Sequence, residues 1–308
     1  MNPILALIIA NLVWGAASPI FKLALTNIPP FTLAFIRFSF AAVLFLPFIK
    51  LFWKKINFQE LLEVLLVGVF GITINISFFF LGLPKTTSIN APIIASSGPI
   101  FIYLLSILFL RERPKAKILF GMLTALIGVL IIILSPIFLE GKRVDFGEIE
   151  GNIFFLIATF GTVMQTIISK DTLKKVNPYQ ATFISFIFGA LTFFPLMIKE
   201  LRIWEFSQLN NNGILGIVFG VFLSSALAYL LFYYGISKIK ASEVGMFTYI
   251  DPVVAIIIAI PLLHEYPNIF FIAGSVLVFG GIFFAEGRLH WHPFHKLKSQ
   301  SSNLKTTT

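Results

Sequence analysis

The side chains that could do chemistry in this chain are a few polar and charged residues inside long apolar segments. Asp251 lies nine residues into the apolar segment 243–263, roughly 13 Å deep and close to the centre of a bilayer. A carboxylate at that depth costs about 2.5–3.5 kcal/mol on insertion scales, so it has to be paired, hydrated or protonated. We predict that Asp251 contacts a substrate and carries a coupled proton. A structural ion pair with no role in turnover is the alternative.

Other polar side chains form two stripes along predicted helices. The stripes consist of Asn11, Trp14, Ser18 and Lys22 in segment 3–25 and of Thr159, Thr162, Thr166 and Lys170 at the end of the chain's sixth segment, 150–169. Their spacing of three or four residues places each set on one helix face. The second set repeats the first 148 residues later. Two equivalent stripes predict a shared, hydrated cavity, whereas any single hydroxyl can simply bond back to its own helix.

Two matching segments contain a proline near the middle of a predicted span. They read Ala95-Ser96-Ser97-Gly98-Pro99 and Thr248-Tyr249-Ile250-Asp251-Pro252. Each proline removes one backbone N–H and leaves a carbonyl of the preceding turn without its usual donor. Because paired interrupted helices point to transport sites, we predict Pro99 and Pro252 as hinges. Simple packing kinks are the alternative.

Two cations inside the spans are candidate charge partners. Arg37 lies about six residues into segment 31–52, so it is expected to pair with a carboxylate or another anionic group. Lys22 lies near the end of its segment and is expected to reach the membrane surface with its ammonium group. Glu112 and Glu265 each precede a proline at the end of a segment, which is typical of helix ends.

The composition indicates a membrane protein. The chain is 57% hydrophobic and 12% charged, whereas about a quarter of the residues of a soluble domain are charged. Ten apolar runs are each close to the roughly 20 residues needed to cross a bilayer core of about 30 Å. The predicted spans are 3–25, 31–52, 60–83, 88–110, 116–138, 150–169, 178–198, 213–236, 243–263 and 268–287.

The chain also repeats itself. A shift of 153 residues superposes Gly82, Lys85, Pro99, Glu112, Pro114, Gly121 and Gly128 on Gly235, Lys238, Pro252, Glu265, Pro267, Gly274 and Gly281. Such a fixed offset indicates an internal duplication. Since each copy holds five spans, the second copy would insert upside down. We predict an all-α, polytopic membrane protein of ten transmembrane helices, built as two inverted five-helix repeats, 1–139 and 149–287.

The distribution of Lys and Arg predicts the orientation. With a cytoplasmic N-terminus, the inside loops and the C-terminal segment hold 16 of the 23 Lys and Arg residues, and the outside loops hold five. This bias predicts that both termini are cytoplasmic. The net charge of +9 then belongs to a rim that attracts anionic lipid headgroups and gives no indication of nucleic-acid binding. The basic segment 288–308 is predicted to be a disordered cytoplasmic tail.

These residues resemble a known family. The opening Trp14-Gly15, Ser18, Lys22, Pro29-Pro30 and Arg37 look like the start of the drug/metabolite transporter superfamily, in its EamA branch. The two proline segments, each followed by a glutamate before a proline, resemble later helices of its two repeats. The resemblance covers residues 3–287 and is weaker in segment 150–169, which lacks the Trp-Gly pair. It implies a ten-helix permease of a prokaryotic inner membrane, of a kind that often exports amino acids or other small metabolites.

We therefore predict a permease that exports a small metabolite by alternating access, with the lipid bilayer as its surroundings and with no cofactor or metal. The predicted substrate contacts are Asn11, Trp14, Ser18, Asn75, Ser96, Thr162, Gln165, Tyr229 and Asp251. An exchanger of phosphorylated sugars or nucleotide-sugars is an alternative, but it requires several basic residues in the cavity. A membrane-embedded enzyme and a non-transporting scaffold are further alternatives. His264-Glu265 lacks the second histidine of a zincin motif.

Overall fold

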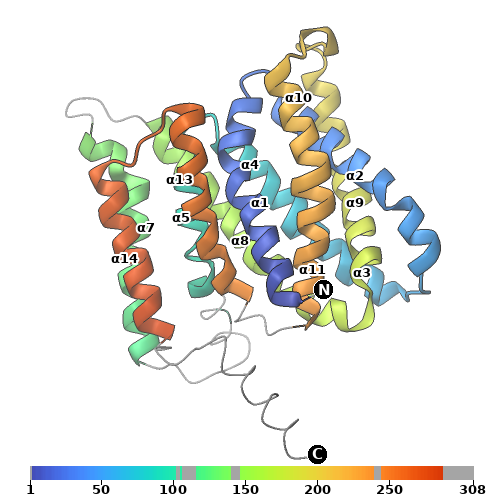
Figure 1. Ribbon diagram of the computed structural model, residues 1–308, viewed down its shortest axis with the longest axis horizontal. Helices are drawn as coiled ribbons and strands as arrows, with labels where there is room; N and C mark the ends of the chain where they lie inside the picture. Colours follow the sequence, from blue (N-terminus) through green and yellow to red (C-terminus); the bar gives the residue numbers. More distant parts are fainter. Residues whose placement is uncertain (1, 102–104, 106–115, 140–145, 239–243, 287–308) are drawn as a thin grey trace, which may run out of the picture.

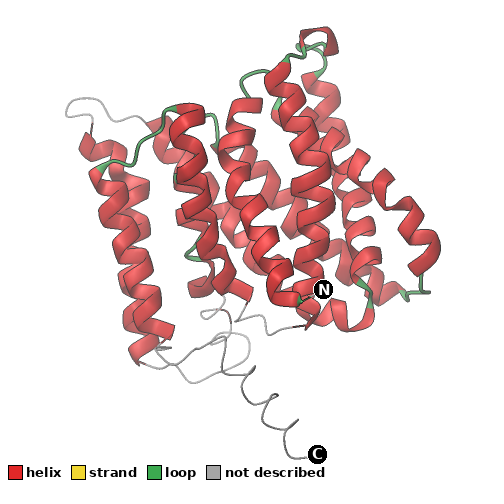
Figure 2. Cartoon of the chain, in the orientation of Figure 1, coloured by secondary structure: helices red, strands yellow, loops and turns green. Residues whose placement is uncertain are grey.

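The computed structural model of the 308-residue chain describes residues 2–101, 105, 116–139, 146–238 and 244–286. Every regular element of this described part is a helix (Figure 2). The elements up to residue 139 are α1 (Pro3–Ala24), α2 (Pro30–Phe52), α3 (Phe58–Gly68), the π-helical η1 (Val69–Ile74), α4 (Asn75–Gly82), α5 (Asn90–Ala95) and α7 (Ala116–Leu139). The elements after residue 145 are α8 (Phe146–Lys175), α9 (Pro178–Glu200), the 3-10 turn η2 (Phe206–Gln208), α10 (Asn211–Val218), the π-helical η3 (Phe219–Leu227), α11 (Ala228–Lys238), the 3-10 turn η4 (Gly245–Tyr249), α13 (Ile250–Leu263) and α14 (Ile269–Glu286).

The helices pack side by side into one bundle (Figure 1). α7 lies along α14 at one end of the bundle, and α2 lies along α9 toward the other. Between these pairs, α1 packs against both α13 and α11, and α8 packs against α4 and α3. Helices from both ends of the sequence therefore surround the central helices α1 and α8.

The predicted class of an all-helical, polytopic membrane protein is confirmed. Among the described residues, seven helices are long and apolar enough to cross a membrane, and two shorter apolar helices cover Phe247–Leu263 and Ile269–Phe284. The total of ten spans, the inverted repeats and the domain boundaries remain predictions. The predicted tail 288–308 and Glu112 lie outside the described residues.

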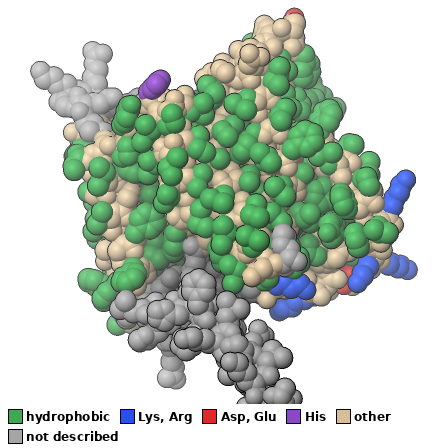
Figure 3. Space-filling model, viewed as in Figure 1, with side chains coloured by type: hydrophobic (Ala, Val, Ile, Leu, Met, Phe, Trp, Pro, Cys, Tyr) green, Lys and Arg blue, Asp and Glu red, His purple; other side chains and the backbone are tan. Residues whose placement is uncertain are grey.

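The exterior of the bundle is largely apolar, as expected for a protein surrounded by lipid. Large apolar side chains cover its flank, whereas Lys and Arg gather along one lower edge (Figure 3). Leu51, Phe120 and Val43 are 75%, 63% and 58% exposed, which would be unfavourable over a whole flank in water. Contact with lipid acyl chains removes that penalty.

Helix ends are fixed by hydrogen bonds to side chains. Asn57 accepts from the Glu60 N–H, and the Glu60 carboxylate accepts from the Asn57 N–H, each over 2.8 Å, which is a capping box at the start of α3. At the start of α2, the Glu200 carboxylate accepts from Phe31 N–H, Thr32 N–H and Thr32 Oγ–H over 3.1, 2.6 and 2.8 Å. These donors would otherwise lack an intrahelical partner, so Glu200 ties the end of α9 to the start of α2.

Four helices change geometry where they pass the centre of the bundle. The helix from Phe58 to Gly82 contains the π segment η1, and the helix from Asn211 to Lys238 contains the π segment η3. The helix of α5 stops at Ala95, turns through Ser96–Ser97 and resumes at Gly98. The 3-10 turn η4 becomes α13 at Ile250, directly before Asp251 and Pro252. Such departures from α-helical geometry are frequent at functional sites.

Candidate functional site

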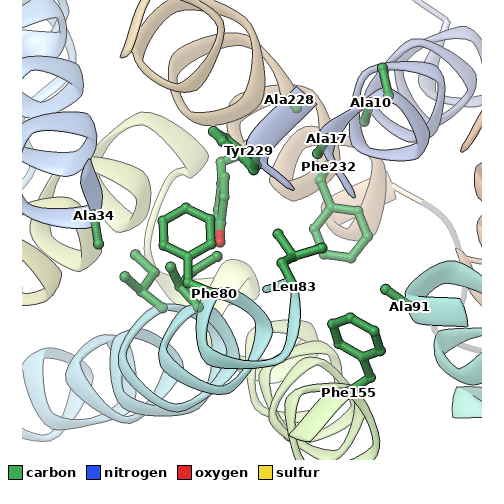
Figure 4. Close-up of a cluster of buried hydrophobic side chains, with 14 of the residues drawn as sticks. Ala10, Ala17, Ala34, Phe80, Leu83, Ala91, Phe155, Ala228, Tyr229 and Phe232 are labelled. Atoms are coloured by element: carbon green, nitrogen blue, oxygen red, sulfur yellow. The ribbon is translucent and has the colours of Figure 1, made fainter. Parts of the chain in front are cut away.

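A cavity of about 160 Å³ lies inside the bundle, where these irregular segments meet α1, α2 and α8. Figure 4 shows Tyr229 and Phe232 of α11 and Phe155 of α8, three of its aromatic lining residues, pointing into the space between the helices. Drug-sized ligands occupy pockets of roughly 300–1,000 Å³. The cavity volume is thus suited to a small metabolite or to about five water molecules at ~30 Å³ each.

Arg37 is the cation of the described cavity lining, and it is 2% exposed. Its Nε donates to Ser225 Oγ over 2.6 Å, and one Nη donates to Ser224 Oγ over 2.9 Å. The guanidinium carbon lies 4.9 and 4.8 Å from the ring centroids of Phe21 and Phe38, within the range of cation–π attraction. The sequence predicts a carboxylate or another anionic group as the partner of Arg37, but no ion pair to Arg37 occurs in the described part of the chain. Neutral partners orient the guanidinium but leave its positive charge uncompensated.

Asp251 brings a carboxyl group to the same cavity. Its side chain lines the cavity, and its Oδ1 is buried without a hydrogen-bond partner among the described residues. Ser18 Oγ, on α1, is buried in the same way. A buried polar atom that lacks a partner costs about 1–3 kcal/mol, and more when it is charged. A ligand or a water molecule in the cavity would remove this cost.

The helix α1 contacts the surroundings of both Arg37 and Asp251. The Trp14 indole N–H donates to the Ser224 carbonyl over 3.1 Å, and Arg37 also donates to Ser224. The next residue, Gly15, packs so closely that a Cβ there would lie 2.8 Å from the Asp251 carbonyl oxygen. The Trp14 ring also makes edge contacts with Tyr229 and Phe232. α1 is thus the wall that Arg37 and Asp251 share.

Seven of the nine predicted substrate contacts line this cavity: Trp14, Ser18, Asn75, Thr162, Gln165, Tyr229 and Asp251. Asn75 Nδ2 donates to the Ala158 carbonyl and to Thr162 Oγ1, each over 2.8 Å, which joins α4 to α8. Most of these side chains are therefore held by protein partners rather than free to reorient.

Tyr229 of α11 and Gln165 of α8 are also held by protein partners. Tyr229 OH donates to the Gly71 carbonyl of η1 over 3.0 Å, and Gln165 Nε2 donates to Tyr233 OH over 3.0 Å. Gly71 itself has no room for a Cβ, because Gln165 fills that space. The π segment therefore leaves the Gly71 carbonyl free to accept a hydrogen bond from Tyr229, while Gln165 packs against the Gly71 Cα.

Two of the predicted contacts lie elsewhere. Asn11 is buried one helical turn before Trp14, and its Nδ2 donates to the Leu7 carbonyl. Ser96 is also buried, and its Oγ donates to the Pro92 carbonyl of its own helix. Neither residue belongs to the cavity lining, although Asn11 Oδ1 has no partner in the described part of the chain.

Of the two predicted hinge prolines, Pro99 lines the cavity, whereas Pro252 is buried outside its lining. Both follow a change in helix geometry, at Ser96–Ser97 and at Ile250. Their role as hinges remains a prediction.

The threonine stripe of α8 serves two purposes. Thr159, Thr162 and Thr166 all line the cavity. Their hydroxyl groups also donate to the carbonyls of Phe155, Ala158 and Thr162, four residues earlier in the same helix. These threonines therefore both hydrogen-bond to carbonyls of their own helix and line the cavity, so the two alternatives for the stripe occur together. Each hydroxyl oxygen can still accept a bond from a ligand.

Lys22 lies near the end of α1, where its side chain was predicted to reach the membrane surface, and it is 25% exposed and also paired. Its Nζ donates to Glu265 Oε1 over 2.5 Å and to the Thr86 carbonyl over 2.6 Å. Glu265 Oε2 accepts from Ser88 N–H and Ser88 Oγ–H over 2.7 and 2.6 Å. We call Lys22, Thr86, Ser88 and Glu265 the Lys22–Glu265 clamp. Glu265 is thus an ion-pair partner as well as a helix-end residue, and the clamp joins the end of α1 to the chain before α5 and the chain after α13.

Sequence reasoning did not single out several residues of the site. Ser224 and Ser225 orient Arg37, and their signal was a pair of adjacent hydroxyl residues inside the apolar segment 213–236. Phe21, Phe79, Phe155, Phe232 and Thr248 also line the cavity. The phenylalanines had no distinguishing signal, because the chain contains 37 of them.

Comparisons with known proteins agree with this architecture. The profile of the EamA-like transporter family matches residues 1–134 and 149–286. An uncharacterized transporter of Archaeoglobus fulgidus is 30% identical over 270 residues, which cover 88% of this chain and 93% of the relative. The uncharacterized transporter YetK of Bacillus subtilis is 29% identical over 293 residues, covering 92% of this chain and 86% of the relative. One crystal structure shares the fold with a TM-score of 0.62 at 17% identity, over 92% of this chain and 96% of its own.

The long apolar helices, the cavity between them and the match to a transporter family identify an integral membrane transporter. The chain belongs to the EamA-like transporter family, as the resemblance of its opening residues and proline segments predicted.

Proposed function

We propose that this protein exports a small zwitterionic metabolite, such as an amino acid, across a prokaryotic inner membrane by alternating access. One observation carries the proposal. A single small cavity is lined by a buried guanidinium without a carboxylate partner and by a carboxylate oxygen without a donor, both within the described part of the chain. A ligand that carries one negative and one positive group would complete both sites at once.

The charges of the cavity favour a zwitterion over a phosphorylated sugar. A phosphate dianion needs several cationic donors, whereas Arg37 is the cation of the described lining. Asp251 would repel a phosphate placed near it. For an amino acid, Arg37 would receive the carboxylate, and Asp251 and Ser18 would receive the ammonium group. The aromatic rings of Trp14 and Phe232 would face the side chain of the substrate.

Alternating access requires one end of the cavity to close while the other opens. The Lys22–Glu265 clamp supports closure at one end, because it joins α1, the chain before α5 and the chain after α13. The 148-residue offset makes Lys170 the counterpart of Lys22. Lys170 Nζ donates to the Ile236 carbonyl of α11 over 2.8 Å. In two inverted repeats of five helices, 1–139 and 149–287, this second lysine would serve closure at the opposite, cytoplasmic end.

Coupling to protons would act through Asp251. A carboxylate inside an apolar bundle is either paired with a cation or protonated. Substrate ammonium and a proton would then compete for the same oxygen atoms, so that export of one would accompany import of the other. Ten helices with cytoplasmic termini complete the proposed arrangement.

The experiment is counterflow in proteoliposomes at two pH values, with labelled amino acids, purines, sugars and phosphosugars. We expect uptake of amino acids only, with competition by the zwitterion at least tenfold stronger than by its des-amino or decarboxylated analogue. Arg37→Gln should remove the preference for a carboxylate, and Asp251→Asn should remove both the preference for an ammonium group and the pH dependence. Arg202→Gln, at an exposed cation outside the cavity, is the matched control.

Several results would contradict the proposal. Uptake of phosphosugars in place of amino acids would establish the exchanger instead. Equal competition by the zwitterion and by its singly charged analogues would show that the two charges do not act together. Unchanged pH dependence in Asp251→Asn would exclude proton coupling through this residue while leaving zwitterion recognition in place.

A further inference from the structure

A second hollow lies away from the substrate cavity, at the end of the bundle that holds the N-terminus. This groove has a volume of about 720 Å³ and is bounded by the ends of α2, α8 and α11 and by the start of α9. Its described lining includes four lysines, Lys54, Lys174, Lys175 and Lys238, and aromatic side chains such as Trp53 and Tyr179. We call it the lysine groove.

Among the described residues, the lysines of the groove outnumber the acidic side chains that pair with them. Lys174 pairs with Asp171 over 2.5 Å, and Lys175 pairs with Glu63 over 2.7 Å. Lys54 and Lys238 are exposed, and neither has an ion-pair partner among the described residues. Lysines near helix C-termini interact favourably with the helix dipole, which accounts for their presence but leaves two ammonium groups free to bind an anion.

The walls of the groove are rigid. Asn177 Nδ2 donates to the Phe52 carbonyl over 2.8 Å, and Gln180 Nε2 donates to the Lys54 carbonyl over 2.8 Å. The Tyr179 ring stacks on the Phe52 ring, with centroids 4.8 Å apart and planes 12° apart. These contacts fix the end of α2 against the start of α9, so the groove is preformed.

The groove also has an apolar flank that faces outward. Leu51 and Trp53 are 75% and 51% exposed, beside Lys54. Figure 3 shows Lys and Arg gathered along this lower edge of the molecule, with apolar side chains covering the flank above them. A soluble anion needs only the ammonium groups. A phospholipid would use the apolar flank as well, because its acyl chains would lie against it while its phosphate reaches the lysines.

We propose that the lysine groove binds the headgroup of an anionic phospholipid of the phosphatidylglycerol or cardiolipin type. Basic pockets between helix ends at a membrane surface are suited to such headgroups. Lys54 and Lys238 would contact the phosphate, and Leu51 and Trp53 would contact the first part of the acyl chains. Since Tyr234 and Lys238 lie on α11, whose Tyr229 and Phe232 line the substrate cavity, the bound lipid would brace the helix that forms one wall of that cavity.

The test measures lipid binding to the full-length chain in detergent by native mass spectrometry. Cardiolipin and phosphatidylglycerol are titrated against phosphatidylcholine, which has a zwitterionic headgroup. We compare the wild type with Lys54→Gln/Lys238→Gln and with a matched control at two exposed cations elsewhere, Lys199→Gln/Arg202→Gln. The replaced side chains of the groove make no ion pair within the described residues, so folding should be retained, and thermal unfolding checks this.

We expect anionic lipid to bind the wild type and the control at least tenfold more tightly than phosphatidylcholine. The groove variant should lose about tenfold or more, because each lysine near an anionic surface contributes about a factor of five. Inorganic phosphate and glycerol 3-phosphate at millimolar concentration should not displace the lipid. Displacement by either would show that the groove serves a soluble anion. Equal binding of all lipids, or equal losses in the two double variants, would show that no specific site exists. The binding readout is independent of transport, so the proposed function can fail without affecting this result.

Discussion

The Lys22–Glu265 clamp gives the sharpest prediction, because its two charges are unequally buried. The side chain of Glu265 is 9% exposed, whereas that of Lys22 is 25% exposed. In Lys22→Met, the carboxylate keeps only its two bonds from Ser88 and becomes a mostly buried, uncompensated charge. In Glu265→Gln, the ammonium keeps the Thr86 carbonyl and can reach water. We therefore expect Lys22→Met to be the more damaging change.

The expected magnitudes follow from this difference. Removing one partner of a buried ion pair costs about 3–5 kcal/mol, and the partial exposure of the clamp places Lys22→Met near the lower limit, at about 3 kcal/mol. Glu265→Gln should cost about 1–2 kcal/mol, because it replaces charged by neutral hydrogen bonds. The double variant should cost less than the sum, with a coupling free energy of about 1.5–3 kcal/mol.

Two assays measure these effects. Thermal unfolding in detergent gives the stability of the two single variants and the double variant. The chain contains no cysteine, so Ala91→Cys in the cavity lining provides a single labelling site. If the clamp closes the cavity, a membrane-impermeant thiol reagent added from outside should label this site about tenfold or more faster in Lys22→Met, at 1.4 kcal/mol for each factor of ten.

Two results would refute the reasoning. A larger loss in Glu265→Gln than in Lys22→Met would show that burial does not determine the cost of the unpaired charge. Strictly additive single effects, together with unchanged labelling, would show that the clamp neither couples the two residues nor closes the cavity.

Three further predictions concern close packing and orientation, two of them in α1 and one in α14. Gly15→Ala should destabilise the protein by about 1–3 kcal/mol in thermal unfolding, because its Cβ would lie 2.8 Å from the Asp251 carbonyl oxygen; an unchanged unfolding temperature would contradict the packing. Gly280→Ala, with nothing within 4 Å of the added carbon, should leave stability unchanged or raise it by up to about 1 kcal/mol, and a loss would show an unrecognised contact. Trp14→Phe removes the bond to the Ser224 carbonyl and should raise the KM for counterflow about fivefold, as one hydrogen bond contributes about 1 kcal/mol; an unchanged KM would mean that this orientation is unimportant for binding.

Long apolar runs predicted the described helices well, because the lipid-facing and core positions both demand apolar side chains. The segment 178–198 corresponds closely to α9, whereas 150–169 is too short for α8, which continues through Asp171 to Lys175. Helix length beyond the apolar core depends on polar residues that work equally well in a loop or in a helix. Hydropathy therefore cannot locate such an end.

The candidate site was predictable where two repeats carried the same signal. Trp14 and Ser18 of α1 and the threonines of α8 line one cavity, as the duplicated stripe suggested. The partner of Lys22 was not predictable, because it lies 243 residues away and no local spacing connects the two. Arg37 shows the same limit, since its hydroxyl partners come from η3.

The bond from the end of α9 to the start of α2 also has a consequence for biosynthesis. Glu200 is made 168 residues after Thr32. At about 5–20 residues per second, a ribosome needs about 8–34 s to cover that distance. During this interval α2 is already synthesised, but the first N–H groups of its helix lack the carboxylate that accepts from them in the finished protein. Water or lipid headgroups must satisfy these donors in the meantime. Insertion of α2 into the bilayer and its final docking are therefore separate events. The docking contact with Glu200 can form only after α9 has been synthesised.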